Sequence, residues 1–297
     1  MGTAKHQKKE CPARAYTHMQ NQSLKKTIQE TRLLPDQLAL FYLGQVGYIV
    51  KFREKYILID GYLSDYVDRN CASELVPWKR RYPAPMSAEE LDFIDYVFCT
   101  HSHYDHADPD TLRAIAKVNP HATYYVSNAI RETLLSYGLP AQSVIGLSCD
   151  TPVALTDFIS VTAIPAAHEE LHENANGDYE EVGFRFDLGG ITLYHAGDGC
   201  PYDGLIERLM NTDILLLPVN GKDYFRRYVS DIIGNFDSRE ASLLAKAVNA
   251  KLLIPTHFDL YDVNALNPAT FVDTVTTLAP DQCYHIFKPG ERYIYAN

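Results

Sequence analysis

The feature that most constrains the fold is a histidine-rich segment that directly follows a strand predicted to be buried. Residues 94–100 form a continuous apolar run, which is typical of a strand covered on both faces. The next residues supply four potential metal ligands within a short stretch: His101, His103, Asp105 and His106. Loops at the carboxyl ends of strands are where α/β proteins usually place their active sites. The chain must therefore fold so that a buried sheet presents this loop to a common site.

The residue types in this loop favour metal binding over a polar surface turn. Neutral imidazole is a ligand for Zn, Fe and Mn-type cations, and carboxylate adds a hard oxygen ligand. A loop that folds back on itself can aim His101 and His103 at one ion and Asp105 and His106 at a second. The alternative is an exposed loop that holds three histidines by chance, which is rare in a chain with 11 histidines among 297 residues.

The pattern of predicted elements indicates an α/β fold. A run of antiparallel strands is followed by strands that alternate with helices, and this order occurs in both halves of the chain. Two mixed sheets packed face to face with helices outside fit this order. We expect residues 1–35 to form a polar N-terminal arm and a helix, and residues 36–297 to form one domain. The helices are expected at 18–34, 109–118, 128–138, near 202–211, at 238–250 with Ser238 as N-cap, and at 268–278. The strands are expected within 38–60 (three strands), 94–100, 122–127, 151–155, 158–166, 180–198 (a hairpin), 213–219, 251–257, 283–287 and 291–296.

Three further polar residues follow apolar strands in the same way as the first loop. His168 follows SVTAIPA, Asp198 stands between Gly197 and Gly199 after ITLYHA, and His257 follows KLLIPT. Taken singly, each is more often structural, since a lone histidine after a strand is commonly a satisfied surface residue. Their shared position at strand ends, together with the first cluster, makes metal ligation the better interpretation.

The series THSHYDH, His168, HAGD and PTHFD resembles the metallo-β-lactamase superfamily. Segments from about residue 36 to the end are similar to the L-ascorbate-6-phosphate lactonase group: LALFYLGQVGYIVKF, DYVFCTHSHYDHAD, LYHAGDGCPYDGL, AKLLIPTHFD and HIFKPGERY. In the lactonase itself an acidic residue occupies the position of His168. The resemblance implies the metallo-β-lactamase fold, a four-layer αββα sandwich of two mixed β-sheets.

The resemblance also implies a ligand scheme for two divalent cations, Mn or Zn, with Fe compatible with the same ligands. One ion would be held by His101, His103 and His168, the other by Asp105, His106 and His257, and Asp198 would bridge both. Two such ions share a water, lower its pKa and generate a hydroxide that attacks a carbonyl or phosphoryl centre. Asp105 is also expected to orient that hydroxide or to carry a proton to the leaving group.

Other residues are expected around this centre. Asp60, at the end of YILID, matches the strand-end aspartate of the superfamily and is expected to hold the histidine loop by hydrogen bonds, as is His195 for the segment of Asp198. Candidate substrate contacts are Tyr104, Asn220, Arg226, Arg227 and Asn235. The arginine pair either grips an anionic group of the substrate or lies on a solvated face.

The sequence favours a hydrolase of a small, polar, anionic lactone or ester over two alternatives. A phosphodiesterase of the same fold has a similar loop, and a non-catalytic metal-binding protein would be expected to lack one of the seven ligands. Redox di-iron members of the superfamily would carry Glu at the position of His103.

Bulk properties limit the partners and the compartment. A formal net charge of −11 disfavours nucleic acid and anionic membranes as partners. No apolar run approaches the roughly 20 residues of a membrane span. The six cysteines are scattered and the first residues contain no apolar signal segment, so a cytoplasmic location is expected. The N-terminal helix is a candidate surface for packing on a partner subunit.

Overall fold

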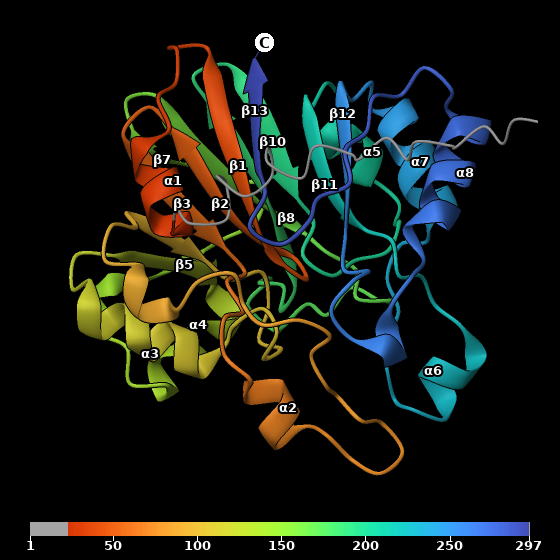
Figure 1. Cartoon of the computed structure of the whole chain (residues 1–297), viewed down its shortest axis with the longest axis horizontal. Helices are drawn as coiled ribbons and strands as arrows, with labels where there is room; N and C mark the ends of the chain where they lie inside the picture. The colour runs from red at the N-terminus through yellow and green to blue at the C-terminus, as the bar shows by residue number, and fades with distance from the viewer. Residues whose placement is uncertain (1–22, 297) are drawn as a thin grey trace, which may run out of the picture.

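Two mixed β-sheets form the centre of the molecule in a computed structural model, which describes residues 23–296 (Figure 1). The seven-stranded sheet has the order β13-β1-β2-β3-β4-β5-β6 and the six-stranded sheet the order β12-β11-β10-β9-β8-β7. The first sheet consists of β1 (Gln37–Gly44), β2 (Gly47–Phe52), β3 (Lys55–Ile59), β4 (Tyr96–Phe98), β5 (Thr123–Ser127), β6 (Val144–Leu147) and β13 (Arg292–Ala296). The second consists of β7 (Pro152–Thr156), β8 (Ile159–Pro165), β9 (Val182–Leu188), β10 (Ile191–His195), β11 (Ile214–Pro218) and β12 (Leu252–Thr256).

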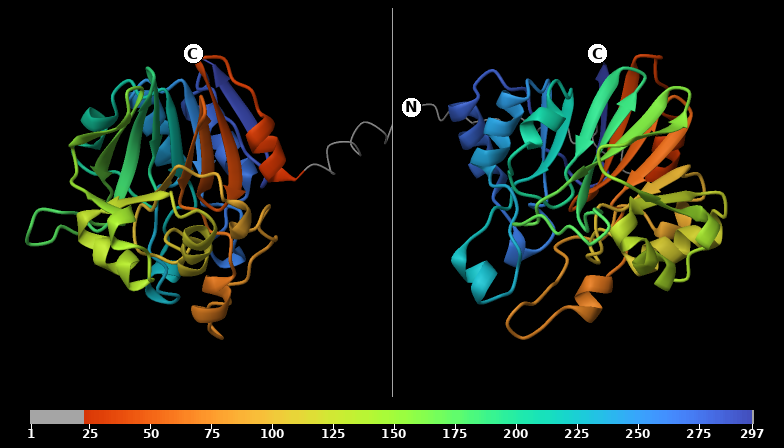
Figure 2. Two further views of the ribbon diagram at one scale, coloured as in Figure 1. Left: turned by 90° about the vertical axis from the view of Figure 1, so that its left-hand side faces the viewer. Right: turned by 180° about the vertical axis from the view of Figure 1, so that it is seen from behind.

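Helices cover the outer face of each sheet. On the seven-stranded sheet lie α1 (Leu24–Glu30), α3 (Pro109–Val118) and α4 (Arg131–Ser136), whose buried residues Ile28, Leu112 and Leu134 belong to one apolar cluster with the strands. On the six-stranded sheet lie α5 (Leu205–Leu209), α7 (Ser238–Ala247) and α8 (Pro268–Leu278). The four layers confirm the predicted αββα architecture (Figures 1 and 2).

The core between the sheets is built from side chains that alternate along the strands. Phe98 of β4 contacts both Phe184 and Phe186 of β9, with ring centroids 5.0 and 4.9 Å apart and the rings edge to face. Aromatic pairs of this kind add stability beyond the area they bury. This packing fixes β4, whose end carries the histidine loop, against the opposite sheet.

Several predicted boundaries are wrong. Residues 283–287 form no strand, because Tyr284 makes only an isolated bridge to Leu253 on the edge of the second sheet. Ser238 is the first residue of α7 and Asp237 is its N-cap, with its side chain accepting a hydrogen bond from the backbone of Glu240. The first helix ends at Glu30, before Pro35.

Other predictions fall on residues outside the described range or are not tested by the structure. Residues 18–22 and most of the polar arm lie outside the described residues, and the division of the chain at residue 35 stays a prediction. Within residues 23–296, no helix combines the length and the apolar character that crossing a bilayer requires.

The loops that follow β3, β4, β8, β10 and β12 gather at one end of the sandwich. Two insertions project from the same end (Figures 1 and 2). One contains α2 (Tyr66–Asn70) and a 3-10 turn (Ala88–Glu90), and the other contains α6 (Tyr224–Tyr228). Short turns of 3-10 helix also lie at Asn128–Ile130, Ala141–Ser143 and Asp262–Asn264. The candidate site lies beneath these two insertions.

Candidate metal centre

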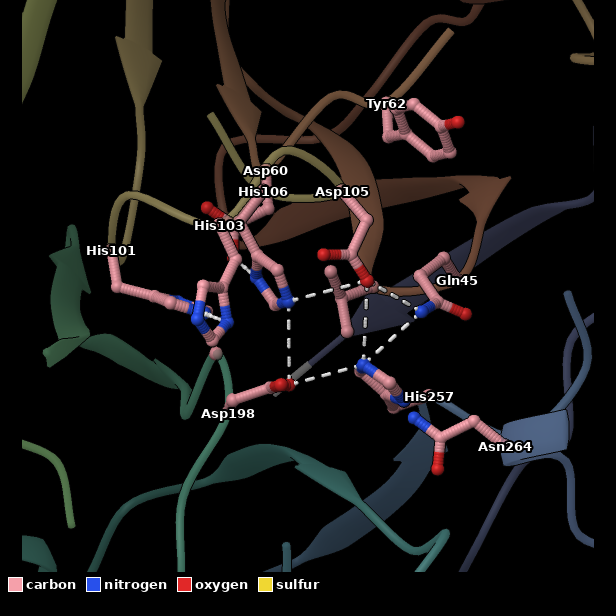
Figure 3. Close-up of polar contacts among 12 residues, drawn as sticks. Gln45, Asp60, Tyr62, His101, His103, Asp105, His106, Asp198, His257 and Asn264 are labelled. Atoms are coloured by element: carbon pink, nitrogen blue, oxygen red, sulfur yellow. Dashed lines mark hydrogen bonds and ion pairs between the residues drawn. The ribbon is translucent and has the colours of Figure 1, made fainter. Parts of the chain in front are cut away.

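The strand-end loops bring all seven predicted ligands into two adjoining groups. All of them except His168 are labelled in Figure 3. In each group the ligand atoms lie within 4.8 Å of one another, a spacing that a metal ion can fill. The first group is His101, His103, His168 and Asp198, and the second is Asp105, His106 and His257. Their ligand atoms are nitrogen and carboxylate oxygen, the donor set that suits Zn, Mn and Fe.

The Asp198 carboxylate faces both groups. Its Oδ1 lies 3.3 Å from Nε2 of His106 and 3.3 Å from Nε2 of His257. Its Oδ2 lies 4.0 Å from Nδ1 of His168 on the other side. One carboxylate with an oxygen towards each group has the arrangement that a bridging ligand needs.

Several ligand atoms are buried and lack an ordinary partner. His106 Nε2, His168 Nδ1 and Asp198 Oδ1 have no hydrogen-bond partner within residues 23–296. Burying a polar atom without a partner costs free energy of about 1–3 kcal/mol. Each group holds such a nitrogen, His168 Nδ1 in the first and His106 Nε2 in the second, and a cation bound in each group would satisfy it.

Three hydrogen bonds join the Asp60 carboxylate to the histidine loop and the residue before it. The carboxylate accepts hydrogen bonds from the backbone N and the Oγ1 of Thr100, at 2.8 and 2.7 Å. It also accepts from Nδ1 of His106 at 2.8 Å, which leaves Nε2 of that ring pointing at Asp198. A carboxylate behind a ligand histidine fixes both its tautomer and its orientation.

His195 connects the two sheets behind Asp198. The ring is fully buried, its Nε2 donates to the Val46 carbonyl at 2.7 Å, and its Nδ1 accepts from the Gly197 backbone N at 3.1 Å. Because Nδ1 accepts a hydrogen bond, the ring is neutral, in keeping with a pKa that burial lowers. His195 thus positions the backbone that leads to Asp198.

Gln45 is a site residue that the sequence analysis missed. It lies in the turn between β1 and β2 with a φ of +59°, and its side chain is buried. The side-chain Nε2 donates to Asp105 Oδ2 at 2.8 Å, and its backbone O accepts from His257 N at 2.8 Å. A polar residue in a turn next to Gly44 was the available signal, and its amide carries none of the metal-ligand chemistry that identified the seven candidate ligands.

The histidines of the two groups differ in pKa and therefore in whether they carry a proton at neutral pH. Burial lowers the pKa of His101 and, to about 4, that of His168, so both rings are neutral at physiological pH. Burial opposes a charge on His106 and His257, but the surrounding carboxylates, Asp198 first and then Asp105, together outweigh burial for both rings. Together they raise the pKa of His106, and that of His257 to about 9. The metal-free second group therefore carries protons that a cation must displace.

We expect metal affinity at the second group to depend steeply on pH. Between about pH 8 and 6, affinity should fall about tenfold for each pH unit and each displaced proton, because His257 and His106 must lose protons to bind. The first group should respond less, since its histidines are already neutral. Competition with a chromogenic chelator at several pH values measures both affinities. Equal pH dependence for the two ions would contradict this assignment.

The predicted substrate contacts have different surroundings. Tyr104 lines the cavity above the metal centre. Asn220 and Asn235 are buried and form a hydrogen-bond chain to Asn264, which also lines the cavity.

The two arginines do not line the cavity and are held by neighbouring side chains. Arg226 donates to the Asn264 side chain at 3.0 Å and is paired with Asp223. Arg227 is paired with Glu169 at 2.9 Å and with Asp231 at 3.3 Å. Both guanidinium groups are thus engaged by the protein itself, and the role of the pair in binding substrate stays a prediction.

Comparisons with known proteins agree with this fold. A UPF0173 metal-dependent hydrolase of Caldivirga maquilingensis is 28% identical over 254 residues, which cover 85% of this chain and 96% of the relative. Another, from Archaeoglobus fulgidus, is 30% identical over 216 residues, covering 71% of this chain and 85% of the relative. Among solved structures, the metallo hydrolase Igni18 from Ignicoccus hospitalis superposes with a TM-score of 0.66 at 20% identity, covering 88% of this chain and 99% of the other. An isothiocyanate hydrolase from Delia radicum gut bacteria superposes with a TM-score of 0.68 at 17% identity, covering 87% and 100%.

The family assignment rests on a match over most of the chain. Residues 55–258, from β3 to just beyond the end of β12, match the family described as the beta-lactamase superfamily domain. This segment includes all seven predicted metal ligands. The chain therefore belongs to this family, the beta-lactamase superfamily.

Proposed function

We propose that this protein is a metal-dependent hydrolase that uses two divalent cations, Mn or Zn, to cleave a lactone or ester. The observation that carries the proposal is the Asp198 carboxylate, whose two oxygens face the two ligand groups. The names of the curated relatives, which are metal-dependent hydrolases, support the reaction class. Placement near the lactonase group rests on the resemblance of the sequence segments.

The chemistry of the site follows from its ligands. Two divalent cations held here would supply Lewis-acid charge and lower the pKa of a shared water towards neutrality. Asp105, fixed by Gln45 through its Oδ2, has a carboxylate at the cavity floor. From there it orients the attacking water and carries a proton to the leaving group. Asp60 and His195 keep the ligand loops in the geometry that this step requires.

A phosphodiester is the main alternative substrate, since the same nucleophile attacks a phosphoryl centre. Hydrolysis assays of the Mn- and Zn-loaded protein across esters, lactones and phosphodiesters decide between them. Turnover of phosphodiesters alone would replace the proposed substrate class. A metal-loaded protein that hydrolyses none of these substrates would favour the non-catalytic alternative.

We expect roughly two metal equivalents per chain after reconstitution with excess Mn or Zn, because both ligand groups are complete. Elemental analysis of the desalted protein measures the ratio. His257→Gln should lower it to about one, since this ligand belongs to the second group alone. A ratio of one in the unmodified protein, unchanged in this variant, would refute the dinuclear proposal.

A further inference from the structure

A cavity of about 510 Å³ opens directly above the candidate metal centre. Its floor includes five of the predicted ligands: His103, Asp105, His168, Asp198 and His257. A volume of this size is typical of sites that enclose a small organic molecule. Whatever is cleaved at the metal centre must place the rest of its structure in this space.

The walls of the cavity come from the two insertions and are largely apolar. The insertion with α2 contributes Val67 and Trp78, and the insertion with α6 contributes Ile232 and Ile233. Trp78 is half-buried and packs edge to face on Tyr261, another lining residue, with ring centroids 5.1 Å apart. These side chains offer contact area to a hydrocarbon or aryl group.

Apart from the metal centre itself, the described lining offers no cationic side chain for an anionic substituent. Among the described residues that line the cavity, none is lysine or arginine, and Asp231 adds a carboxylate at the rim. The nearest basic residues of the α6 insertion are paired with acidic neighbours: Arg226 with Asp223, Arg227 with Glu169, and Lys222 with Glu240. Breaking these pairs to bind a substrate would leave carboxylates without partners.

We infer that the cavity binds the apolar part of an uncharged ester or lactone, with an alkyl or aryl group against Trp78, Val67 and Ile232. This inference rests on the proposed hydrolase function and replaces the anionic substrate that the sequence suggested. The metal centre takes the reacting carbonyl, and the insertions select the group attached to it. Selectivity then grows with the apolar area that the substrate buries.

A homologous series of neutral esters tests this inference in the metal-loaded full-length protein. From acetate to hexanoate esters of one alcohol, kcat/KM should rise roughly fourfold for each methylene until the cavity is filled. Adding a terminal carboxylate to the same acyl chain should lower kcat/KM. Trp78→Ala should flatten the rise mainly through KM, with the metal content unchanged, and Trp78→Phe should restore most of it.

The matched control is Phe225→Ala, which removes an exposed aromatic side chain from the insertion with α6. Since Phe225 does not line the cavity, the chain-length dependence should be unchanged. The inference is overturned if the anionic esters are the better substrates and Arg227→Ala removes that preference. It is also overturned if Trp78→Ala and Phe225→Ala have the same small effect.

A binding measurement separates failure of this inference from failure of the proposed function. Trp78 is the single tryptophan of the chain, so its fluorescence reports occupancy of the cavity. In metal-free protein, 2-octanone should shift the emission of Trp78, and octanoate should bind more weakly. Binding of 2-octanone without turnover of any ester would refute the hydrolase and retain the apolar site. Ester turnover without binding of 2-octanone would refute the apolar site and retain the hydrolase.

Discussion

Asp198→Ala should abolish hydrolysis while the fold is retained. Asp198 is the one predicted ligand that faces both groups, so its loss removes a bridge that no neighbouring residue in the described chain replaces. Metal ions contribute several kcal/mol to transition-state stabilisation, and each ~1.4 kcal/mol is a tenfold rate change. We therefore expect kcat to fall at least about 10³-fold.

The fold should survive because other carboxylates still face the two histidines. Without Asp198, His106 keeps Asp60 and His257 keeps Asp105 as a partner, so neither ring is left as an unpaired buried charge. Circular dichroism should match the unmodified protein, and elemental analysis should show a lower metal content. Asp198→Asn, which keeps the shape but not the charge, should resemble the alanine variant.

His121→Ala is the control for this experiment. His121 is exposed and lies outside both ligand groups, so its replacement should leave turnover within about twofold of normal. Near-normal turnover of Asp198→Ala, with metal still bound, would show that the carboxylate does not bridge the ions.

The gathering of the seven candidate ligands could be predicted from the sequence because each segment that carries them follows an apolar strand. The periodicity that predicts β4, β8, β10 and β12 also predicts where their loops meet, since the ends of these strands lie at one end of the sandwich. Asp60 was found by the same argument. Gln45 was not, because it lies in a tight turn between antiparallel strands and a single amide carries no distinctive metal-ligand chemistry.

The cavity walls could not be predicted, and the reason is physical. Trp78, Ile232 and Ile233 lie in insertions with no helical or strand periodicity, and their arrangement depends on tertiary contacts such as Trp78 against Tyr261. The short helix α6 likewise has five residues, too few for a periodic signal. The role of Arg226 was left open for the same reason, since its partner Asn264 is 38 residues away.

The strand predicted at 283–287 is an error of another kind, because the sequence predicts an element that the structure does not form. Its alternating apolar residues are typical of a strand, but the segment lies beside β12, the edge of the second sheet, and makes one bridge through Tyr284. Tertiary context overrode the local pattern there. The strand β6 was missed because its four residues, VIGL, are too few to show a strand periodicity.

Gly197→Ala should damage both stability and activity, although residue 197 supplies no ligand atom. Gly197 has a φ of +61°, and a Cβ placed on it would lie 2.5 Å from Oγ1 and 2.6 Å from Cβ of Thr100. Thr100 cannot easily move away, because Asp60 holds it by two hydrogen bonds. A left-handed backbone at alanine and an overpacked contact together cost about 2–5 kcal/mol of unfolding free energy.

The same clash acts on the metal centre, since Thr100 precedes His101 and Gly197 precedes Asp198. A displacement of about 1 Å in such ligands costs on the order of 10²-fold in kcat. Gly199→Ala is the matched control on the other side of Asp198. A Cβ there meets its nearest neighbour, the Phe236 ring, at 3.7 Å, so stability should change by less than about 0.5 kcal/mol. Urea unfolding of the metal-free proteins and ester turnover of the loaded proteins measure the two effects. If both glycine variants behave alike, the contact between Gly197 and Thr100 does not set the geometry of the site.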